Sequence, residues 1–391
     1  MPDEVGRKPR RAWHTSVPRL SQFALEHLLL LPLGVALALI WANVYPESYF
    51  RFSHAWAFGV NDVAMVFFFG LMTKEVVEAT APGGFLHRWR RVLLPIIAAV
   101  GATAVPALIY PHLVEWFDEP MLAMAWPVTF ATDLAVSYLA VRLIYGTGHA
   151  AIPFTILLAI ASDAMGVVAL AVLTPTHEPH WTAGLLILVL AILLAALLRR
   201  MRVRSFWPYV LGPGSASWFS LYWGGLHPAL ALVPIVPFLP HAARDPGFFV
   251  DADQNAPDPL SQFEVFWRYP AQVALFFFGL VNAGVTPGSL EEGTWALPLA
   301  VCLGKPIGAT LAAYLGTLVG FHLPHGFGWR DLIVVGLCSA IGLSVGLFFA
   351  TGLIAPGQLR SEISMGVLVT IAALPMALIF SKLLGAGRYR R

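Results

Sequence analysis

Long apolar runs, separated by short charged or Pro- and Gly-rich breaks, fill almost the whole chain of 391 residues. A helix needs about 20 mostly apolar residues to cross the hydrocarbon core of a bilayer. The breaks predict twelve such helices, over 23–44, 57–78, 92–114, 121–144, 150–174, 181–199, 206–222, 224–240, 267–288, 295–320, 331–353 and 363–385. The pattern therefore predicts an all-α polytopic membrane protein, with 1–391 as a single membrane domain.

The composition supports this class and excludes others. Hydrophobic residues make up 58% of the chain and charged residues 12%, which is about half of the charged share of an ordinary globular protein. The net charge of +2 is too small to indicate nucleic-acid binding. No nucleophile–base pair, metal cluster or phosphate loop stands out, so we expect a transporter that is not an enzyme and needs no cofactor. Cys302 and Cys338 lie in apolar runs and are expected to be small core residues.

The basic residues predict the orientation. With the N-terminus inside, 20 of the 24 Lys and Arg residues fall on the inner side, and only Arg51 and Arg360 fall outside. The remaining two, Lys74 and Lys305, lie within spans. Inner loops of membrane proteins carry the excess of Lys and Arg, so both termini are expected to be cytoplasmic.

Three ionisable residues lie near the middle of predicted spans: Asp133, Asp163 and Lys305. A charge at the bilayer centre costs several kcal/mol, so its presence indicates a functional site. At one depth, these groups could form an ion or proton site near the midplane. A structural ion pair between Lys305 and one aspartate is the alternative, although it leaves the second acid unexplained. An interfacial or snorkelling role is expected for the charged residues nearer span ends, Glu26, Asp62, Lys74, Glu75 and Glu78.

Oxygen atoms surround the candidate site, and hard cations prefer oxygen ligands. Asp163 has Ser162 beside it, and Thr132 with Asp133 offers more oxygens from a second span. A carboxylate buried in an apolar bundle can hold a proton near neutral pH. Competition between a proton and a cation for Asp163 would by itself produce exchange.

Two spans contain helix-breaking residues at comparable depth. Pro127 precedes Thr132 and Asp133 in the fourth span, and Gly336, Gly342 and Gly346 lie in the eleventh. Proline frees backbone carbonyls, and interrupted segments in corresponding places indicate inverted repeats.

Six sequence pieces, in this order, resemble the NhaA family of bacterial sodium/proton antiporters, itself a standard example of inverted-repeat architecture. The pieces are Asn61-Asp62 with Val66–Gly70, Pro95–Ala99 with Val105–Leu108, Ala131–Asp133, Asn282–Val285, Gly304–Pro306 and Val334–Cys338. The resemblance implies a core of spans three to five (92–174) and ten to twelve (295–385), with spans four and eleven broken and crossing. It also implies exchange of Na⁺ or Li⁺ for H⁺ in the bacterial inner membrane, by a homodimer surrounded by lipid.

The resemblance also assigns roles to single residues. The cation-binding aspartate of the family corresponds to Asp163, its Thr-Asp pair to Thr132 and Asp133, where the aspartate offsets helix-end dipoles, and its lysine to Lys305. Glu75 matches a glutamate of the cytoplasmic funnel that is linked to pH response. His227 matches a histidine near an interface.

One position departs from the family pattern, because Ser162 stands where members usually carry the first of two aspartates. Lys305 thereby loses its expected counter-charge, and could turn to Asp163, turn to carbonyls at span ends, or rest neutral. With one exchangeable proton, we expect electroneutral exchange of one cation for one proton; titration of Lys305 itself would restore a second proton. A sodium-coupled symporter of an organic solute and a non-transporting paralogue are the alternative functions.

Overall fold

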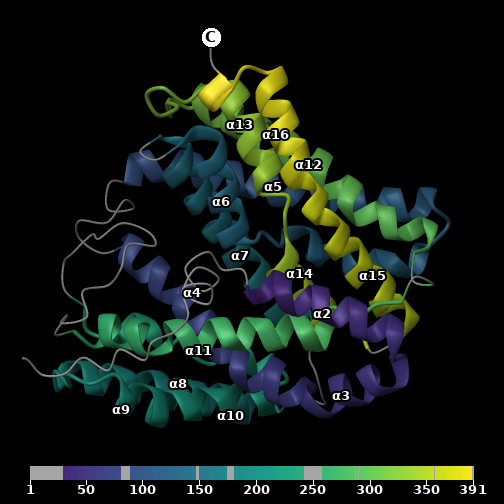
Figure 1. Ribbon diagram of the computed structural model, residues 1–391. Coiled ribbons are helices and arrows are strands. Elements are labelled where there is room, and N and C mark those ends of the chain that lie inside the picture. The colour runs from purple at the N-terminus through teal and green to yellow at the C-terminus, as the bar shows by residue number, and fades with distance from the viewer. Residues whose placement is uncertain are drawn as a thin grey trace, which may run out of the picture.

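The computed structural model describes residues 30–80, 89–146, 149–173, 180–241, 258–286, 288, 290–355 and 357–389, and across these residues all regular structure is helical (Figure 1). The α-helices are α2 (Leu30–Val44), α3 (Pro46–Phe58), α4 (Met65–Thr80), α5 (Trp89–Trp116), α6 (Leu134–Tyr145), α7 (Ala151–Leu173), α8 (Trp181–Arg200), α9 (Trp207–Tyr209), α10 (Ser215–Trp223), α11 (Pro259–Asn282), α12 (Ala296–Leu318), α13 (Trp329–Cys338), α14 (Leu343–Leu353), α15 (Gln358–Val369) and α16 (Ala373–Leu383). The predicted all-α class is confirmed.

Five helical stretches in the described residues are long and apolar enough to cross a membrane. They are Pro46–Glu78, Val92–Trp116, Trp181–Arg200, Glu292–Leu318 and Gln358–Tyr389. A sixth is reached if α13 and α14, which are bent by 52° at a short break, count as one span. The other predicted spans are not among these stretches, so the count of twelve stays a prediction.

The predicted spanning α-helix over 224–240 is wrong. This stretch consists of turns and two 3-10 segments of three residues each, Pro228–Leu230 and Val236–Phe238. Pro228, Pro234, Pro237 and Pro240 explain the irregular path, because each lacks the backbone N–H that an α-helix needs and its ring clashes with the preceding turn.

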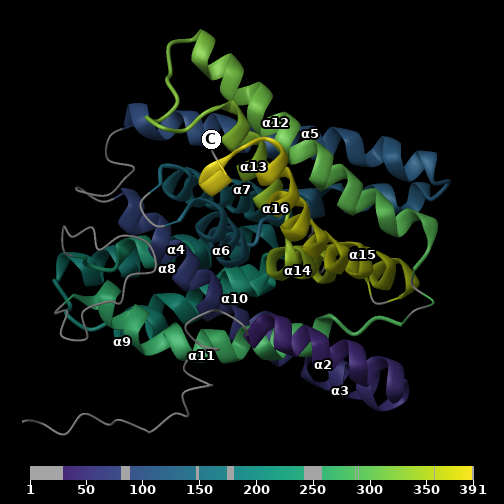
Figure 2. The ribbon, with the colours of Figure 1, turned by 45° about the horizontal axis from the view of Figure 1, so that its top comes forward.

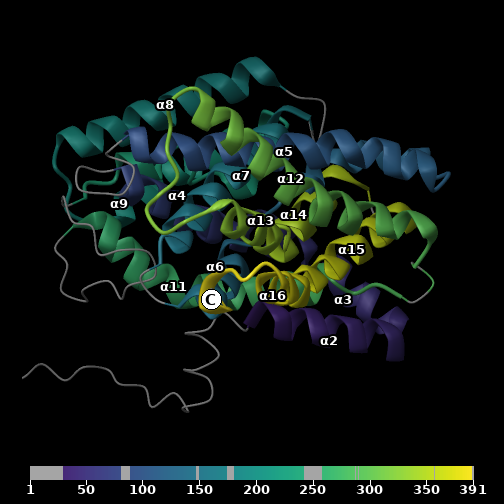
Figure 3. The same cartoon turned by 90° about the horizontal axis from the view of Figure 1, so that it is seen from above.

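The helices form two groups. In Figures 1 and 2, α2, α3 and α11 lie on the opposite side of the molecule from α12 and α13. Within the first group α2 packs on α11 and α8 on α10; within the second, α5 packs on α12, α6 on α7 and α13 on α16. Seen from above, α8 and α2 follow opposite edges of the molecule (Figure 3). Helix α14 contacts α11 as well as α15 and α7, and so connects the two groups.

The crossing of α5 and α12 depends on glycine. A Cβ atom at Gly101 or at Gly308 would overlap the carbonyl oxygen of the other residue. One turn earlier on α12, a Cβ at Gly304 would lie 2.7 Å from the Cα of Pro106. Small residues let helix backbones approach closely in membrane proteins. The close approach fixes α12, and with it Lys305, against α5.

Candidate cation and proton site

Two interrupted segments meet in the second helix group. The first is a 3-10 helix, η3 (Pro120–Phe130), followed by extended residues Ala131–Asp133 and then α6. The second is α13, a non-helical turn over 339–342, and α14. The backbone N–H of Asp133 donates to the carbonyl oxygen of Ile341 at 2.6 Å, so the two breaks lie directly against each other. A Cβ at Gly342 would lie 2.9 Å from the carbonyl oxygen of Ala131, which favours glycine at this contact.

Asp133 caps the helices that begin at both breaks. Its Oδ1 accepts a hydrogen bond from the backbone N–H of Val136 at 3.1 Å, in the first turn of α6. Its Oδ2 accepts from the backbone N–H of Ser344 at 3.1 Å and from the Ser344 hydroxyl at 2.9 Å, in the first turn of α14. Helix N-termini carry a partial positive charge and unpaired N–H groups, and this buried carboxylate satisfies both ends at once.

Lys305 occupies the complementary position, at the ends of the segments that stop at the breaks. Its fully buried ammonium group donates to the carbonyl oxygen of Ala131, to that of Ser339 at 2.9 Å, and to the Thr132 hydroxyl at 2.8 Å. Within the described residues, no carboxylate oxygen lies within 4.0 Å of this nitrogen. Of the outcomes expected for Lys305, the structure shows the turn to span-end carbonyls. Asp133 and Asp163 make no contact with its ammonium within 4.0 Å, although Asp163 is near enough to interact with it electrostatically.

Asp163 lies on α7 beside this crossing, and its side chain is only partly satisfied. Its Oδ1 accepts a hydrogen bond from the backbone N–H of Thr132 at 3.2 Å. Its Oδ2 and the neighbouring Ser162 hydroxyl are both buried and have no hydrogen-bond partner among the described residues. A buried polar atom without a protein partner is costly, and a bound water or ion is one of the explanations for it. The structure therefore brings Thr132, Asp133, Asp163 and Lys305 together, with Ser162 next to Asp163 in the chain.

Glu75 lies in a different charged cluster, on α4 and α11. Lys74 is buried, and its ammonium lies 2.6 Å from Glu78, 2.7 Å from Glu264 and 3.3 Å from Glu75. The expected snorkelling role is therefore wrong for Lys74, because three carboxylates compensate its charge inside the protein. Glu264 is not among the residues predicted from the sequence, because it lies before the predicted span over 267–288. The signal for a helix there is the Asp258-Pro259 start, where the Asp258 carboxylate accepts from the Ser261 backbone N–H at 3.1 Å.

His227 lies apart from both lysines, in the irregular segment before Pro228. Its Nδ1 accepts from the backbone N–H of Ala229 at 3.4 Å and lies 3.7 Å from the Asp62 carboxylate. Its ring centroid is 4.5 Å from that of Phe348 on α14. His227 thus contacts the middle of α14, the helix that connects the two groups, and does not meet Glu75 or Asp163. Cys302 and Cys338 are buried free thiols, as expected.

Known proteins resemble the chain over most of its length. The sequence model of the Na⁺/H⁺ antiporter 1 family matches residues 22–380. The Na⁺/H⁺ antiporter NhaA of Geotalea uraniireducens is 39% identical over 363 residues, covering 90% of this chain and 93% of that protein. NhaA of Desulfitobacterium hafniense strain DCB-2 is 39% identical over 378 residues, covering 94% and 97%. The solved structure of the sodium proton antiporter MjNhaP1 from Methanocaldococcus jannaschii at pH 8 aligns with a TM-score of 0.59 at 16% identity, covering 93% and 95%.

The likeness to MjNhaP1 concerns the fold, whereas the identity and coverage of the NhaA relatives define the family. Members of this family are membrane transporters and not enzymes. The chain belongs to the NhaA family of Na⁺/H⁺ antiporters.

Proposed function

We propose that the protein exchanges Na⁺ or Li⁺ for H⁺ across the bacterial inner membrane, with both ions competing for the Asp163 carboxylate. The observation that carries this proposal is the buried, unpartnered Oδ2 of Asp163 beside the two helix breaks. A proton on this carboxylate neutralises it, and a cation bound to it replaces the proton. Since the group cannot hold both, release of one ion accompanies uptake of the other.

The oxygen atoms near Asp163 fit a small hard cation. Such ions take oxygen ligands from carboxylates, hydroxyls and backbone carbonyls. The Ser162 hydroxyl is buried without a partner among the described residues, and we assign it, with the Thr132 hydroxyl, to the cation's ligand set alongside Asp163. Asp133 is fully engaged in capping α6 and α14, so its role is to hold the crossing and not to exchange ions.

The exchange ratio follows from the charge at Lys305. An ammonium group has three N–H donors, and three good acceptors surround this one: two backbone carbonyls and the Thr132 hydroxyl. This set supports a permanently charged Lys305, because a neutral amine offers only two donors. With Ser162 in place of a second acid, one exchangeable proton remains. We therefore infer that one cation exchanges for one proton and that the cycle moves no net charge.

A voltage experiment tests this ratio. A cycle that moves one net charge gains about 2.3 kcal/mol per 100 mV of membrane potential, whereas an electroneutral cycle gains nothing. In proteoliposomes with balanced Na⁺ and H⁺ gradients, an imposed potential should leave wild-type exchange unchanged. Ser162→Asp, which supplies a second acid, should make exchange respond to the potential. Voltage-driven exchange by the wild type would show that a second group, such as Lys305, also carries a proton.

The pH dependence of the apparent Na⁺ affinity, measured in the same liposomes, tests the exchange ratio a second time. If one proton competes with one cation, the apparent Na⁺ affinity should improve about tenfold per pH unit as pH rises and then reach a plateau. Two competing protons would double that slope. Exchange that is retained but responds to voltage would overturn only the one-for-one ratio, whereas absence of exchange would overturn antiport itself.

The arrangement in the membrane is part of the same proposal. We infer that both termini lie in the cytoplasm, that η3–α6 and α13–α14 are the broken spans of two inverted repeats, and that the protein is a homodimer. The bias of Lys and Arg supports the orientation. Labelling of single cysteines introduced near Arg51 and Arg360, from outside intact cells, should succeed; labelling only in inverted vesicles would reverse the orientation.

A further inference from the structure

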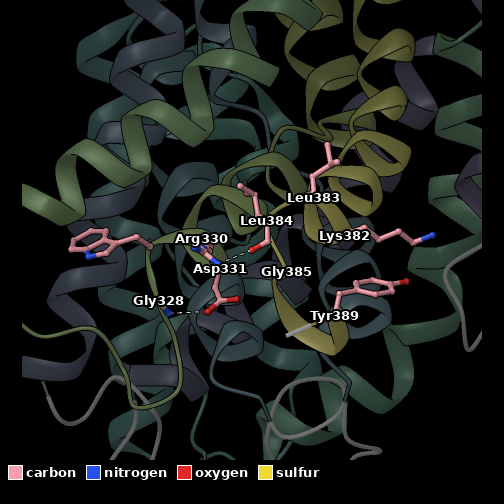
Figure 4. A pocket seen from close by; sticks show the side chains of 9 residues that line it. Gly328, Arg330, Asp331, Lys382, Leu383, Leu384, Gly385 and Tyr389 are labelled. Atoms are coloured by element: carbon pink, nitrogen blue, oxygen red, sulfur yellow. Dashed lines mark hydrogen bonds between the residues drawn. The ribbon is translucent and has the colours of Figure 1, made fainter. Parts of the chain in front are cut away.

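A pocket of about 670 Å³ lies where the beginning of α13 meets the end of α16 (Figure 4). Arg330 and Lys382, both exposed, line it from these two segments. Arg330 donates from Nη1 to the carbonyl oxygen of Leu384 at 3.3 Å, which holds its guanidinium in the pocket. The Lys382 ammonium lies 5.5 Å from the ring centroid of Tyr389, and both side chains extend to the same side (Figure 4).

One acidic residue also lines the pocket. Asp331 is buried, and its Oδ2 accepts from the backbone N–H of Gly328 at 2.8 Å, at the start of α13. The pocket therefore carries two exposed basic side chains against one buried acid. The chemistry of the basic side chains fits a phosphate group, since Arg and Lys bind phosphate oxygens by charge-assisted hydrogen bonds.

A second hollow continues from this pocket along the neighbouring helix. A groove of about 620 Å³ lies between α12 and α13 and shares Trp329 with the basic pocket. Its walls are almost wholly apolar and include Ile307, Leu311 and Tyr314, each about half exposed. From Tyr314 to Ile307 the groove follows two turns of α12, or about 10 Å at 1.5 Å per residue.

We propose that the pocket and the groove together bind one anionic glycerophospholipid, with its phosphate between Arg330 and Lys382 and an acyl chain along α12. A free anion would use only the basic pocket, and an apolar molecule would use only the groove. The two hollows meet at Trp329, so the polar and apolar parts of one lipid fit them together. Trp and Tyr are enriched at the membrane–water interface, where a headgroup lies. Trp329 lines both hollows, Tyr314 the groove and Tyr389 the basic pocket.

The distribution of basic residues supports the same ligand. The excess of Lys and Arg assigns this end of the molecule, which also carries the C-terminus (Figure 1), to the cytoplasmic side. Basic pockets between helices on that side bind anionic headgroups. Helix α13 runs from Trp329 in the pocket to the break where the Ser339 carbonyl accepts from Lys305. A bound lipid therefore stabilises one of the segments that hold Lys305, although its binding does not depend on the proposed ion exchange.

The test uses the full chain in detergent micelles and measures binding of dioleoyl phosphatidylglycerol by native mass spectrometry. Arg330→Gln and Lys382→Gln should each weaken binding about fivefold, which corresponds to about 1 kcal/mol per basic residue near a charged headgroup. The matched control is Arg51→Gln, which removes one exposed charge from the opposite face and should bind like the wild type. All three positions are exposed, so the variants are expected to fold. Unchanged binding by the Arg330→Gln/Lys382→Gln double variant would overturn the proposal.

Other probes separate the possible sources of the phosphate. Dioleoyl phosphatidylcholine should bind more weakly, with an affinity that the two substitutions do not change. Leu311→Asn, which places an amide in the groove, should weaken dioleoyl phosphatidylglycerol but not glycerol 3-phosphate. If glycerol 3-phosphate or inorganic phosphate competes at the same concentration as the lipid, the occupant is a free anion and the lipid proposal is wrong.

Discussion

The protein buries two lysines and compensates them in opposite ways. Lys74, on α4, lies within 3.3 Å of three carboxylates, those of Glu75, Glu78 and Glu264. Lys305, on α12, has no carboxylate within 4.0 Å among the described residues and donates to backbone carbonyls and a hydroxyl. A buried charge must be paired and hydrogen-bonded, or its cost is several kcal/mol. Both sites meet this requirement, but only the first one uses acids.

This difference shows how a transport site can bury a lysine without binding its carboxylate to that lysine. The C-terminal end of a helix carries the equivalent of about half a negative charge, so two such ends can together compensate one ammonium group. Ala131 and Ser339 provide these ends because both chain segments are interrupted there. Asp163 is then not needed as a counter-charge for Lys305. In the Lys74 cluster every acid is bound to the lysine, which leaves no carboxylate for exchange.

The largest expected effect comes from removing the free acid. Asp163→Asn keeps the shape of the side chain but can neither release a proton nor bind a cation with charge. It should abolish exchange, measured as Na⁺- and Li⁺-induced collapse of a pH gradient in proteoliposomes. Asp118→Asn is the matched control, because Asp118 is exposed with φ of 58°, a conformation that asparagine tolerates. Substantial transport by Asp163→Asn would place the exchange site elsewhere.

The second largest expected effect is a loss of stability when either buried lysine is replaced. Lys74→Met and Lys305→Met each remove a buried charge without changing side-chain length much, and each should lower stability by about 3 kcal/mol or more. The pH dependence should differ. At low pH the glutamates around position 74 become protonated and lose their mutual repulsion, so the deficit of Lys74→Met should shrink on acidification and grow as pH rises. Carbonyl oxygens do not titrate, so the deficit of Lys305→Met should change less with pH than that of Lys74→Met, with the nearby Asp163 as the acid that can still contribute.

Thermal unfolding of both variants in detergent, each compared with the wild type between pH 5 and pH 9, measures this difference. Equal shrinkage of the two deficits at low pH would contradict the comparison, since it would require an acid as the partner of Lys305. A constant deficit for Lys74→Met would show that the three glutamates do not share its charge.

The sequence predicted the participants at these sites better than their contacts. Asp133, Asp163 and Lys305 are recognisable because ionisable residues at mid-span are rare, and the family resemblance aligns them. Apart from the Thr132 hydroxyl, the partners of Lys305 are backbone carbonyls, which every residue carries, so no side-chain pattern marks them. Their exposure depends on where two chain segments break, and this is decided by packing between elements about 200 residues apart.

Prediction of the fold from the sequence is limited in a similar way. Apolar runs identify the helical class, but hydropathy does not distinguish a helix from a buried irregular segment. The stretch 224–240 is apolar enough to span, yet four prolines break it into turns. Glu264 falls before the predicted span over 267–288, whereas α11 begins at Pro259, five residues before Glu264. A charge compensated by Lys74 can continue a helix that hydropathy alone would end.

The smallest expected effect lies at Asp133, the negative counterpart of Lys305 at the crossing. Ser344→Ala removes one hydrogen bond to the Asp133 carboxylate and leaves the backbone bonds from Val136 and Ser344 in place. A hydrogen bond to a charged group contributes roughly 1.5 kcal/mol, so thermal unfolding should show a small loss of stability, with exchange retained. Ser217→Ala is the control, because this buried hydroxyl has no partner among the described residues and its removal should cost nothing measurable. Equal losses in both variants would mean that burial of a hydroxyl, and not its bond to Asp133, sets the effect; a loss at Ser344 alone would show that the capping carboxylate holds the two helix starts together while Lys305 holds the two helix ends.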